Sequence, residues 1–159
     1  MTRDVQTGLE AILKSAPGVP VMVIENAAEA VPLARALVKG GLPVLEITLR
    51  TKAALECIKA IIAEVEGAIV GVGTVLDGKK LRETEHIGCA FAVSPGFTRS
   101  LLDAAEDMII PLLPGSATAA ECMTLMERGC RFQKFFPAEA AGGVAYLASL
   151  ASPLPQVNF

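Results

Sequence analysis

The stretch VLEITLR, residues 44–50, decides the fold class of this chain. Apolar and polar residues alternate in it, so positions 45, 47 and 49 share one face of a strand, and Glu46, Thr48 and Arg50 share the other. Both faces of a buried parallel strand are ordinarily apolar. Three polar groups on one face therefore need either partners, such as a structural ion pair with another strand, or a ligand. Glu46 and Arg50 are roughly 13 Å apart at about 3.3 Å per residue, so they do not pair directly.

Similar short apolar runs recur along the whole chain. They begin at positions 19, 43, 68, 89, 108, 130 and 155, so 19 to 25 residues separate each run from the next. Such an interval holds one strand of about five to seven residues and one helix of roughly ten to fifteen residues. An extra helix is expected before the first strand, at about residues 4–15. Capping residues predict further helix starts at Asn26, Thr51, Asp77, Thr98 and Thr118.

Continuous strand–helix alternation indicates an α/β protein with a mostly parallel sheet, either an open doubly wound sheet or a closed barrel. No GxGxxG motif follows the first run, which weakens the dinucleotide-binding version of the open sheet. Polar residues at the carboxyl ends of several strands favour the barrel. A barrel typically needs about 200 or more residues, and the chain has 159. We therefore predict a single incomplete domain over residues 1–159. It is a (β/α)8 TIM barrel truncated to about six βα units plus the start of strand seven.

Composition excludes several classes of protein. The chain is 52% hydrophobic and 19% charged, which rules out disorder. A net charge of −3 argues against nucleic-acid binding. The longest uncharged stretch, residues 140–159, is interrupted by glycines and prolines, so no membrane span is expected. Four cysteines without a CxxC pair, in a chain that begins without a secretory signal, indicate reduced buried thiols and a cytoplasmic location. A single histidine and no carboxylate cluster make a metal site improbable.

A lysine lies among aromatic residues in FQKFFP, residues 132–137. Enclosure of Lys134 by three phenylalanines would remove water from its charged form and make the neutral amine available. A desolvated lysine is what carbonyl chemistry through a Schiff base requires. The alternative is a lysine that extends to the surface from a strand end.

Three further strand ends carry glycine and hydroxyl groups: GVGT at residues 71–74, SPG at 94–96 and PGS at 114–116. Glycine permits close approach of the backbone, and Thr74 offers a hydroxyl. Each segment alone is more typical of a tight turn between strand and helix. Together, on neighbouring strands, they indicate a site.

Five segments carry a family resemblance: VLEITLRT, VGVGTVL, AVSPGFT, PLLPGSAT and KFFPAEAAGG. In this order and spacing, the chain resembles the 2-keto-3-deoxy-6-phosphogluconate / 4-hydroxy-2-oxoglutarate aldolase family from about Val19 to Phe159. The resemblance implies a class I aldolase on a (β/α)8 barrel, commonly a homotrimer, with no metal or other cofactor. Its partner would be a small phosphorylated keto acid. Its products would be pyruvate and glyceraldehyde 3-phosphate, with 4-hydroxy-2-oxoglutarate as a second substrate.

The resemblance also assigns roles to residues. Lys134 matches the lysine that forms the Schiff base, and Glu46 matches the general acid/base. Arg50 and Thr74 match residues that hold the pyruvate-derived carboxylate. Residues that line the pocket nearby correspond to Pro95 and Phe136.

Three alternatives remain open from the sequence. The first is a related aldolase that acts on the galactonate-derived isomer, although its second strand usually lacks the segment EITLRT. Family members continue beyond the segment matching Val157–Phe159 into glycine-rich ends that bind carboxylate and phosphate, so a non-catalytic truncated barrel is the second alternative. The third is another phosphate-handling barrel enzyme, such as an epimerase, although suitable histidine or metal ligands are missing.

Overall fold

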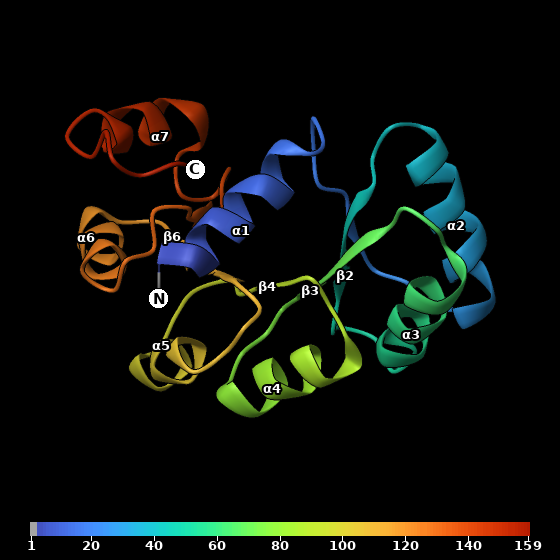
Figure 1. The fold of residues 1–159 in the computed structure, drawn as a ribbon. Helices are drawn as coiled ribbons and strands as arrows, with labels where there is room; N and C mark the ends of the chain where they lie inside the picture. Colours follow the sequence, from blue (N-terminus) through green and yellow to red (C-terminus); the bar gives the residue numbers. More distant parts are fainter. Residues whose placement is uncertain (1–2) are drawn as a thin grey trace.

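The protein is built from repeated strand–helix units, and the computed structural model describes residues 3–159 (Figure 1). The helices are α1 (Arg3–Lys14), α2 (Ala27–Lys39), α3 (Ala54–Glu64), α4 (Gly78–Ile87), α5 (Arg99–Glu106), α6 (Ala119–Glu127) and α7 (Gly143–Ala151). The strands are β1 (Val21–Met22), β2 (Val44–Thr48), β3 (Ile69–Gly73), β4 (Phe91–Val93), β5 (Leu112–Leu113), β6 (Gly115–Ser116) and β7 (Lys134–Phe135).

All strand pairs are parallel, and their order follows the chain. Strands β1 to β5 form one sheet in the order β1-β2-β3-β4-β5, and β6 pairs with β7 in a second, two-stranded sheet. Pro114 alone separates β5 from β6, so the two sheets continue one another along the chain. Phe132 then forms an isolated parallel bridge with Asn158. A doubly wound sheet reverses its strand order at a switch point. The consecutive order found here is that of the barrel.

Six strand–helix units precede Asn158, as the sequence predicted, but several strands are shorter than expected. The sequence indicated five to seven residues per strand, whereas β1, β5, β6 and β7 have two each. Pro20 precedes β1, Pro114 interrupts the fifth strand, and Pro137 follows β7 closely. Proline lacks the N–H group that a strand ladder needs, which explains the short ladders.

Four of the five predicted helix caps are formed, and one prediction is wrong. The side chains of Asn26, Asp77, Thr98 and Thr118 accept hydrogen bonds from backbone N–H groups in the first turns of α2, α4, α5 and α6. Thr51 does not cap α3, because that helix begins only at Ala54. Its hydroxyl instead donates to the carbonyl of Ile24 over 2.7 Å.

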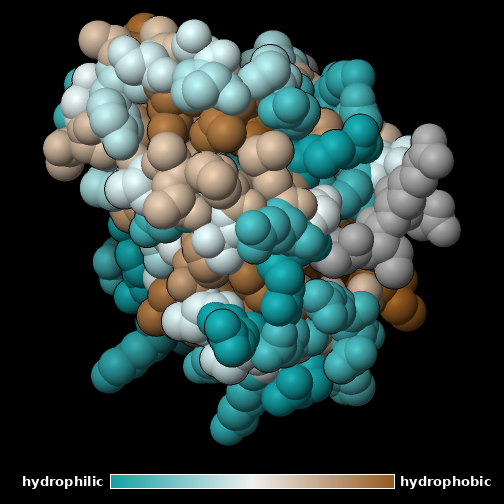
Figure 2. Space-filling model, turned by 90° about the vertical axis from the view of Figure 1, so that its left-hand side faces the viewer, coloured by the Kyte–Doolittle hydropathy of each residue, from teal (hydrophilic) through white to brown (hydrophobic). Residues whose placement is uncertain are grey.

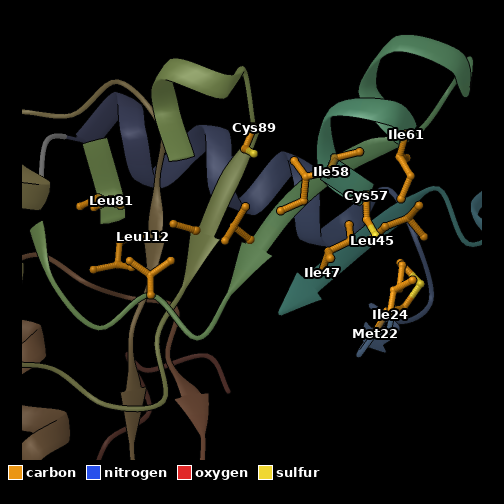
Figure 3. Close-up of a cluster of buried hydrophobic side chains, with 14 of the residues drawn as sticks. Met22, Ile24, Leu45, Ile47, Cys57, Ile58, Ile61, Leu81, Cys89 and Leu112 are labelled. Carbon is orange, nitrogen blue, oxygen red and sulfur yellow. The ribbon is translucent and has the colours of Figure 1, made fainter. Parts of the chain in front are cut away.

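The core lies between the five-stranded sheet and the helices on one side of it. Leu45 and Ile47 of β2 pack against Ile58 and Ile61 of α3, and all four are fully buried (Figure 3). Helix α1 lies on the other side of the sheet (Figure 1). Its Leu9 packs on Val44, Phe91 and Val93 in a second cluster. Helix α1 therefore covers part of the face of the sheet that lies opposite the main core.

A third, smaller cluster joins α6 to the end of the chain. Cys122 of α6 packs with Leu150, Leu154 and Val157. Figure 2 views the side that carries α6 and α7 and shows hydrophobic surface reaching the outside between them. The four members of the cluster are buried, whereas Met123 of α6, which lies outside it, is 54% exposed.

Candidate active site

A cavity of about 420 Å³ opens at the carboxyl ends of the strands. Every residue that the sequence analysis proposed for the site lines it, and Val21 of β1 is the further lining residue. The lining residues are Val21, Glu46, Arg50, Thr74, Pro95, Lys134 and Phe136. They come from five segments of the chain. Three of these residues lie within β1, β2 and β7 (Val21, Glu46 and Lys134), and four lie just beyond the carboxyl end of a strand (Arg50, Thr74, Pro95 and Phe136). This is where the active sites of barrel enzymes are built.

Lys134 and Glu46 form an ion pair in this cavity. The Nζ atom of Lys134 lies 3.4 Å from Oε1 of Glu46. The Lys134 side chain is 25% exposed and that of Glu46 only 5%. The Phe136 ring centroid lies 5.4 Å from the same ammonium group, a distance typical of cation–π contact. The amine is therefore screened from bulk water and has a carboxylate within reach for proton transfer.

The surroundings of Lys134 differ from the sequence expectation in one respect. Three phenylalanines were expected around the amine, but the ring of Phe135 stacks on Tyr146 of α7, with centroids 6.0 Å apart. Phe135 follows Lys134 directly in β7, and successive side chains of a strand point to opposite faces. The ammonium group thus contacts a carboxylate, that of Glu46, and one aromatic ring, that of Phe136.

Glycine makes room for the buried carboxylate. Gly73 of β3 lies opposite Thr48 of β2 in the parallel register. A Cβ atom built on Gly73 would overlap the carboxylate of Glu46. The sequence suggested that the glycines of GVGT permit close approach. The structure identifies the approaching group as the Glu46 side chain.

The polar residues that follow one face of β2 have different roles, some structural and some at the cavity. The Thr48 hydroxyl donates to the carbonyl of Met22 over 3.0 Å, so it serves the β1–β2 pairing and needs no ligand. Within residues 3–159, no ion pair or hydrogen bond engages the guanidinium of Arg50, which is exposed at the cavity wall. Arg50 is therefore free to bind an anionic group, and its planar fork matches a carboxylate.

Thr74 adopts an unusual backbone conformation at the cavity wall. Its φ is 63°, and among residues 3–159 it alone has a positive φ without being glycine. A β-branched residue in this region is strained by about 1–3 kcal/mol, and such strain clusters at functional sites. The segment after β4 also packs closely on β6, because a Cβ atom on Gly115 would overlap the carbonyl oxygen of Pro95.

A second, larger cavity of about 560 Å³ shares Val21, Glu46 and Lys134 with the first. Most of its other lining is apolar and includes Leu13 of α1, Phe132 and Phe159. The sequence analysis did not predict this space. It depends on where α1 and the last residues of the chain lie, which strand patterns do not reveal.

Other candidate features lie outside the site. His86 is exposed in the last turn of α4. All four cysteines are buried and free. In the part of the chain that the structure describes, no group of three or more His, Cys, Asp or Glu side chains could hold a metal ion. Across residues 3–159, no helix has the length and apolar character needed to cross a membrane.

The fold and the cavity together define a class of protein. A lysine amine, a buried carboxylate and an unpaired guanidinium converge at the carboxyl ends of parallel barrel strands. This arrangement is suited to condensation of the amine with a keto acid. The class is that of lysine-dependent carbon–carbon lyases on a β/α barrel.

Comparison with known proteins gives the family. The family model "KDPG and KHG aldolase" matches residues 9–159. The KHG/KDPG aldolase of Escherichia coli K12 is 51% identical over 154 residues, which are 97% of this chain and 72% of that protein. The chain belongs to the KDPG and KHG aldolase family, and it spans about 72% of the length of that relative.

Solved structures agree in fold as well as in sequence. The 2-keto-3-deoxy-6-phosphogluconate aldolase of Zymomonas mobilis ZM4, solved with 3-phosphoglycerate, superposes with a TM-score of 0.91 at 50% identity, covering 95% of this chain and 72% of that one. The KDPG aldolase of Legionella pneumophila superposes with a TM-score of 0.90 at 41% identity, over 94% and 72% of the two chains. In that crystal, pyruvate is captured as a covalent carbinolamine intermediate. A KDPGal structure is more distant, at 29% identity and a TM-score of 0.78, over 87% and 68%. The barrel prediction is confirmed.

Proposed function

We propose that this protein is a class I aldolase that cleaves 2-keto-3-deoxy-6-phosphogluconate to pyruvate and glyceraldehyde 3-phosphate. 4-Hydroxy-2-oxoglutarate, which would yield pyruvate and glyoxylate, is the second substrate. The observation that carries the proposal is the pairing of Lys134 with Glu46 at 3.4 Å in a cavity that also holds Arg50. The family of the chain and the greater distance of the KDPGal structure favour the gluconate series over the galactonate series.

Lys134 would act as the nucleophile. Its neutral amine adds to the C2 ketone to give a carbinolamine, which loses water to form an iminium ion. The electrons of the C3–C4 bond then move into the iminium group, which leaves an enamine, while the C4 hydroxyl loses its proton and becomes the aldehyde. Protonation of the enamine at C3 and hydrolysis of the iminium release pyruvate and regenerate the amine.

Glu46 would move the protons in these steps, taking the proton of the C4 hydroxyl and supplying one to the enamine. A positioned carboxylate typically contributes about 10²- to 10⁴-fold to such transfers. Arg50 and Thr74 would hold the carboxylate of the pyruvate portion, and Pro95 and Phe136 would line the cavity beside it. These roles rest on the cavity lining and on the motifs that the chain shares with the family.

Replacing Lys134 by methionine tests the function. We expect Lys134→Met to abolish pyruvate release from 2-keto-3-deoxy-6-phosphogluconate, measured with a coupled dehydrogenase assay. Lys39→Met, at an exposed lysine in the last turn of α2, is the matched control and should keep the full rate. Unchanged turnover in Lys134→Met would reject the mechanism. No turnover in the wild-type chain would favour a non-catalytic barrel. Turnover of a phosphosugar without any lysine adduct would favour an epimerase.

The remaining predictions concern assembly and place in the cell. We propose a homotrimer in the cytoplasm, on the basis of the family resemblance and of the four free cysteines. Sedimentation equilibrium checks the assembly, since a trimer would have about three times the chain mass of 16.5 kDa. The division into one incomplete barrel domain over residues 1–159, with an extra helix at about 4–15, stays a prediction.

A further inference from the structure

The strand that carries Lys134 is held by two short ladders. On the edge away from β6, the N–H of Gln133 donates to the carbonyl of Asn158 over 2.9 Å, and the N–H of Asn158 donates to that of Arg131 over 2.8 Å. β6 and β7 have two residues each and form their own sheet. The N–H of Lys134 donates to Pro114 over 2.9 Å, and the N–H of Phe136 donates to Ser116 over 3.2 Å. Ladders this short supply few of the hydrogen bonds that fix the position of the strand along its axis.

A buried side-chain network reinforces this strand from its other face. Gln133 is 1% exposed, and its Oε1 accepts a hydrogen bond from the Ser116 hydroxyl over 2.8 Å. Its Nε2 donates to the carbonyls of Cys122 and Cys130, each over 3.2 Å. The Ser116 oxygen also accepts from the Cys122 thiol over 3.5 Å. One amide thus joins β6, α6 and the turn before β7.

A glutamine at this position is not what core packing alone requires. Residues of a parallel strand that face a helix are ordinarily apolar. A buried amide is tolerated only when its groups are hydrogen-bonded. Here both amide atoms have partners whose directions fix the side chain, whereas an apolar residue could slide without loss of directional bonds. The network therefore restricts movement of β7 relative to β6 and α6.

Lys134 is the next residue along this strand and faces the cavity. A shift of β7 would move Nζ relative to Glu46, whose own strand, β2, is paired on both sides by β1 and β3. We propose that the Ser116–Gln133 pair, together with the carbonyls of Cys122 and Cys130, is a positioning device for the reactive lysine. Its catalytic meaning rests on the function proposed above, and Gln133 and Ser116 act through Lys134 without touching the substrate.

The test measures how fast pyruvate and cyanoborohydride label Lys134, over a range of pyruvate concentrations and pH values. Gln133→Leu removes all three bonds of the amide, Ser116→Ala removes one, and Ser116→Thr keeps the hydroxyl. Thr84→Val is the control, because it removes another buried hydroxyl bond, to Lys80 in α4, away from the site.

We expect Gln133→Leu to lower the maximal labelling rate about 10- to 100-fold, since a misplacement of about 1 Å can reduce a rate about 100-fold. The half-saturating pyruvate concentration should change less than about twofold, because Arg50 and Thr74 are untouched, and the pH optimum should shift. Ser116→Thr should stay within about threefold of wild type. The labelling rate of Ser116→Ala should lie between those of Gln133→Leu and Ser116→Thr. If Gln133→Leu does not fold, Ser116→Ala tests the proposal in its place.

Two results would overturn the proposal. One is a wild-type labelling rate and pH profile in both Gln133→Leu and Ser116→Ala, and the other is a loss of labelling rate in Thr84→Val as large as that in Gln133→Leu. If the wild-type chain takes no label, the proposed aldolase function fails, and a second readout decides this inference separately. It is the acetylation rate of Lys134 with acetic anhydride, relative to Lys39 in the same sample. A changed ratio in Gln133→Leu supports the positioning device, and an unchanged ratio overturns it.

Discussion

Glycines of β3 are explained by the side chains that lie over them. Gly71 pairs with Phe91 of β4, and a Cβ atom on Gly71 would overlap the Phe91 ring. Gly73 leaves space for the Glu46 carboxylate in the same way. Glycine inside a strand ordinarily weakens it and marks a close approach. In this protein, Gly71 leaves space for a core side chain, and Gly73 leaves space for a side chain of the candidate site.

Gly73→Ala should disable the site although it replaces no charged residue. The added methyl group would push the Glu46 carboxylate away from Lys134, so we expect pyruvate labelling of Lys134 to slow at least about tenfold. Overpacking should lower the free energy of unfolding by about 1–3 kcal/mol, measured by urea titration. Gly18→Ala is the control, because no atom lies within 4 Å of its Cβ position. Labelling at the wild-type rate in Gly73→Ala would contradict this role of the glycine.

Most helices of this protein begin at a capping residue. Thr118 and Glu121 form a reciprocal capping box at the start of α6. The backbone N–H of Ala117 donates to the Glu121 carboxylate, as do the hydroxyl and N–H of Thr118. These bonds lower the pKa of Glu121 from its ordinary value of 4.5, and the bond from Ala117 contributes most to the lowering.

This lowered pKa predicts a pH-dependent stability difference. A carboxylate whose pKa is depressed by folding stabilises the protein above its unfolded pKa, and the stabilisation is lost as pH falls through the lower folded pKa. Glu121→Gln should therefore be less stable than wild type at pH 7, and the difference should shrink as pH falls below 4.5. Urea titrations between pH 3 and 7 measure it. Glu127→Gln, at the exposed end of the same helix, is the control. A pH-independent difference for Glu121→Gln would contradict the capping account.

Local patterns predicted the elements well where the local signal was complete. The alternation in β2 and the caps of α2, α4, α5 and α6 each depend on a few adjacent residues, and the structure has them. Thr51 misled the prediction, because its hydroxyl binds a carbonyl 27 residues away in the chain. The two-residue strands were also missed, since a strand's length depends on whether its neighbour offers an unbroken ladder.

The reactivity of the four buried cysteines measures how well the whole molecule is packed. Burial raises the pKa of Cys89 to about 12 and that of Cys130 to about 11. Burial also raises the pKa of Cys57 and Cys122. Because the thiolate is the reactive form, buried thiols with raised pKa react slowly.

We therefore expect no rapid reaction of the native protein with Ellman's reagent at pH 8, and reaction of all four thiols when urea unfolds the chain. Ser100→Cys adds an exposed thiol on α5 as a control that should react at once. Rapid reaction of any native cysteine would contradict the packing described here.

The gathering of the six proposed site residues around one cavity was predictable, because barrel geometry brings together the carboxyl ends of successive strands. The Lys134–Glu46 pair and the Gln133 network were not, because they join residues 88 and 17 positions apart in the chain. Their formation depends on how β7 docks against β2 and α6. No single-sequence pattern encodes that docking.

The most direct test of the central claim is the mass of the intact chain after treatment with pyruvate and borohydride. The account predicts a single reduced-pyruvate adduct that peptide mapping places on Lys134 and that is absent in Lys134→Met. An unmodified chain, or an adduct on any other lysine, would contradict it.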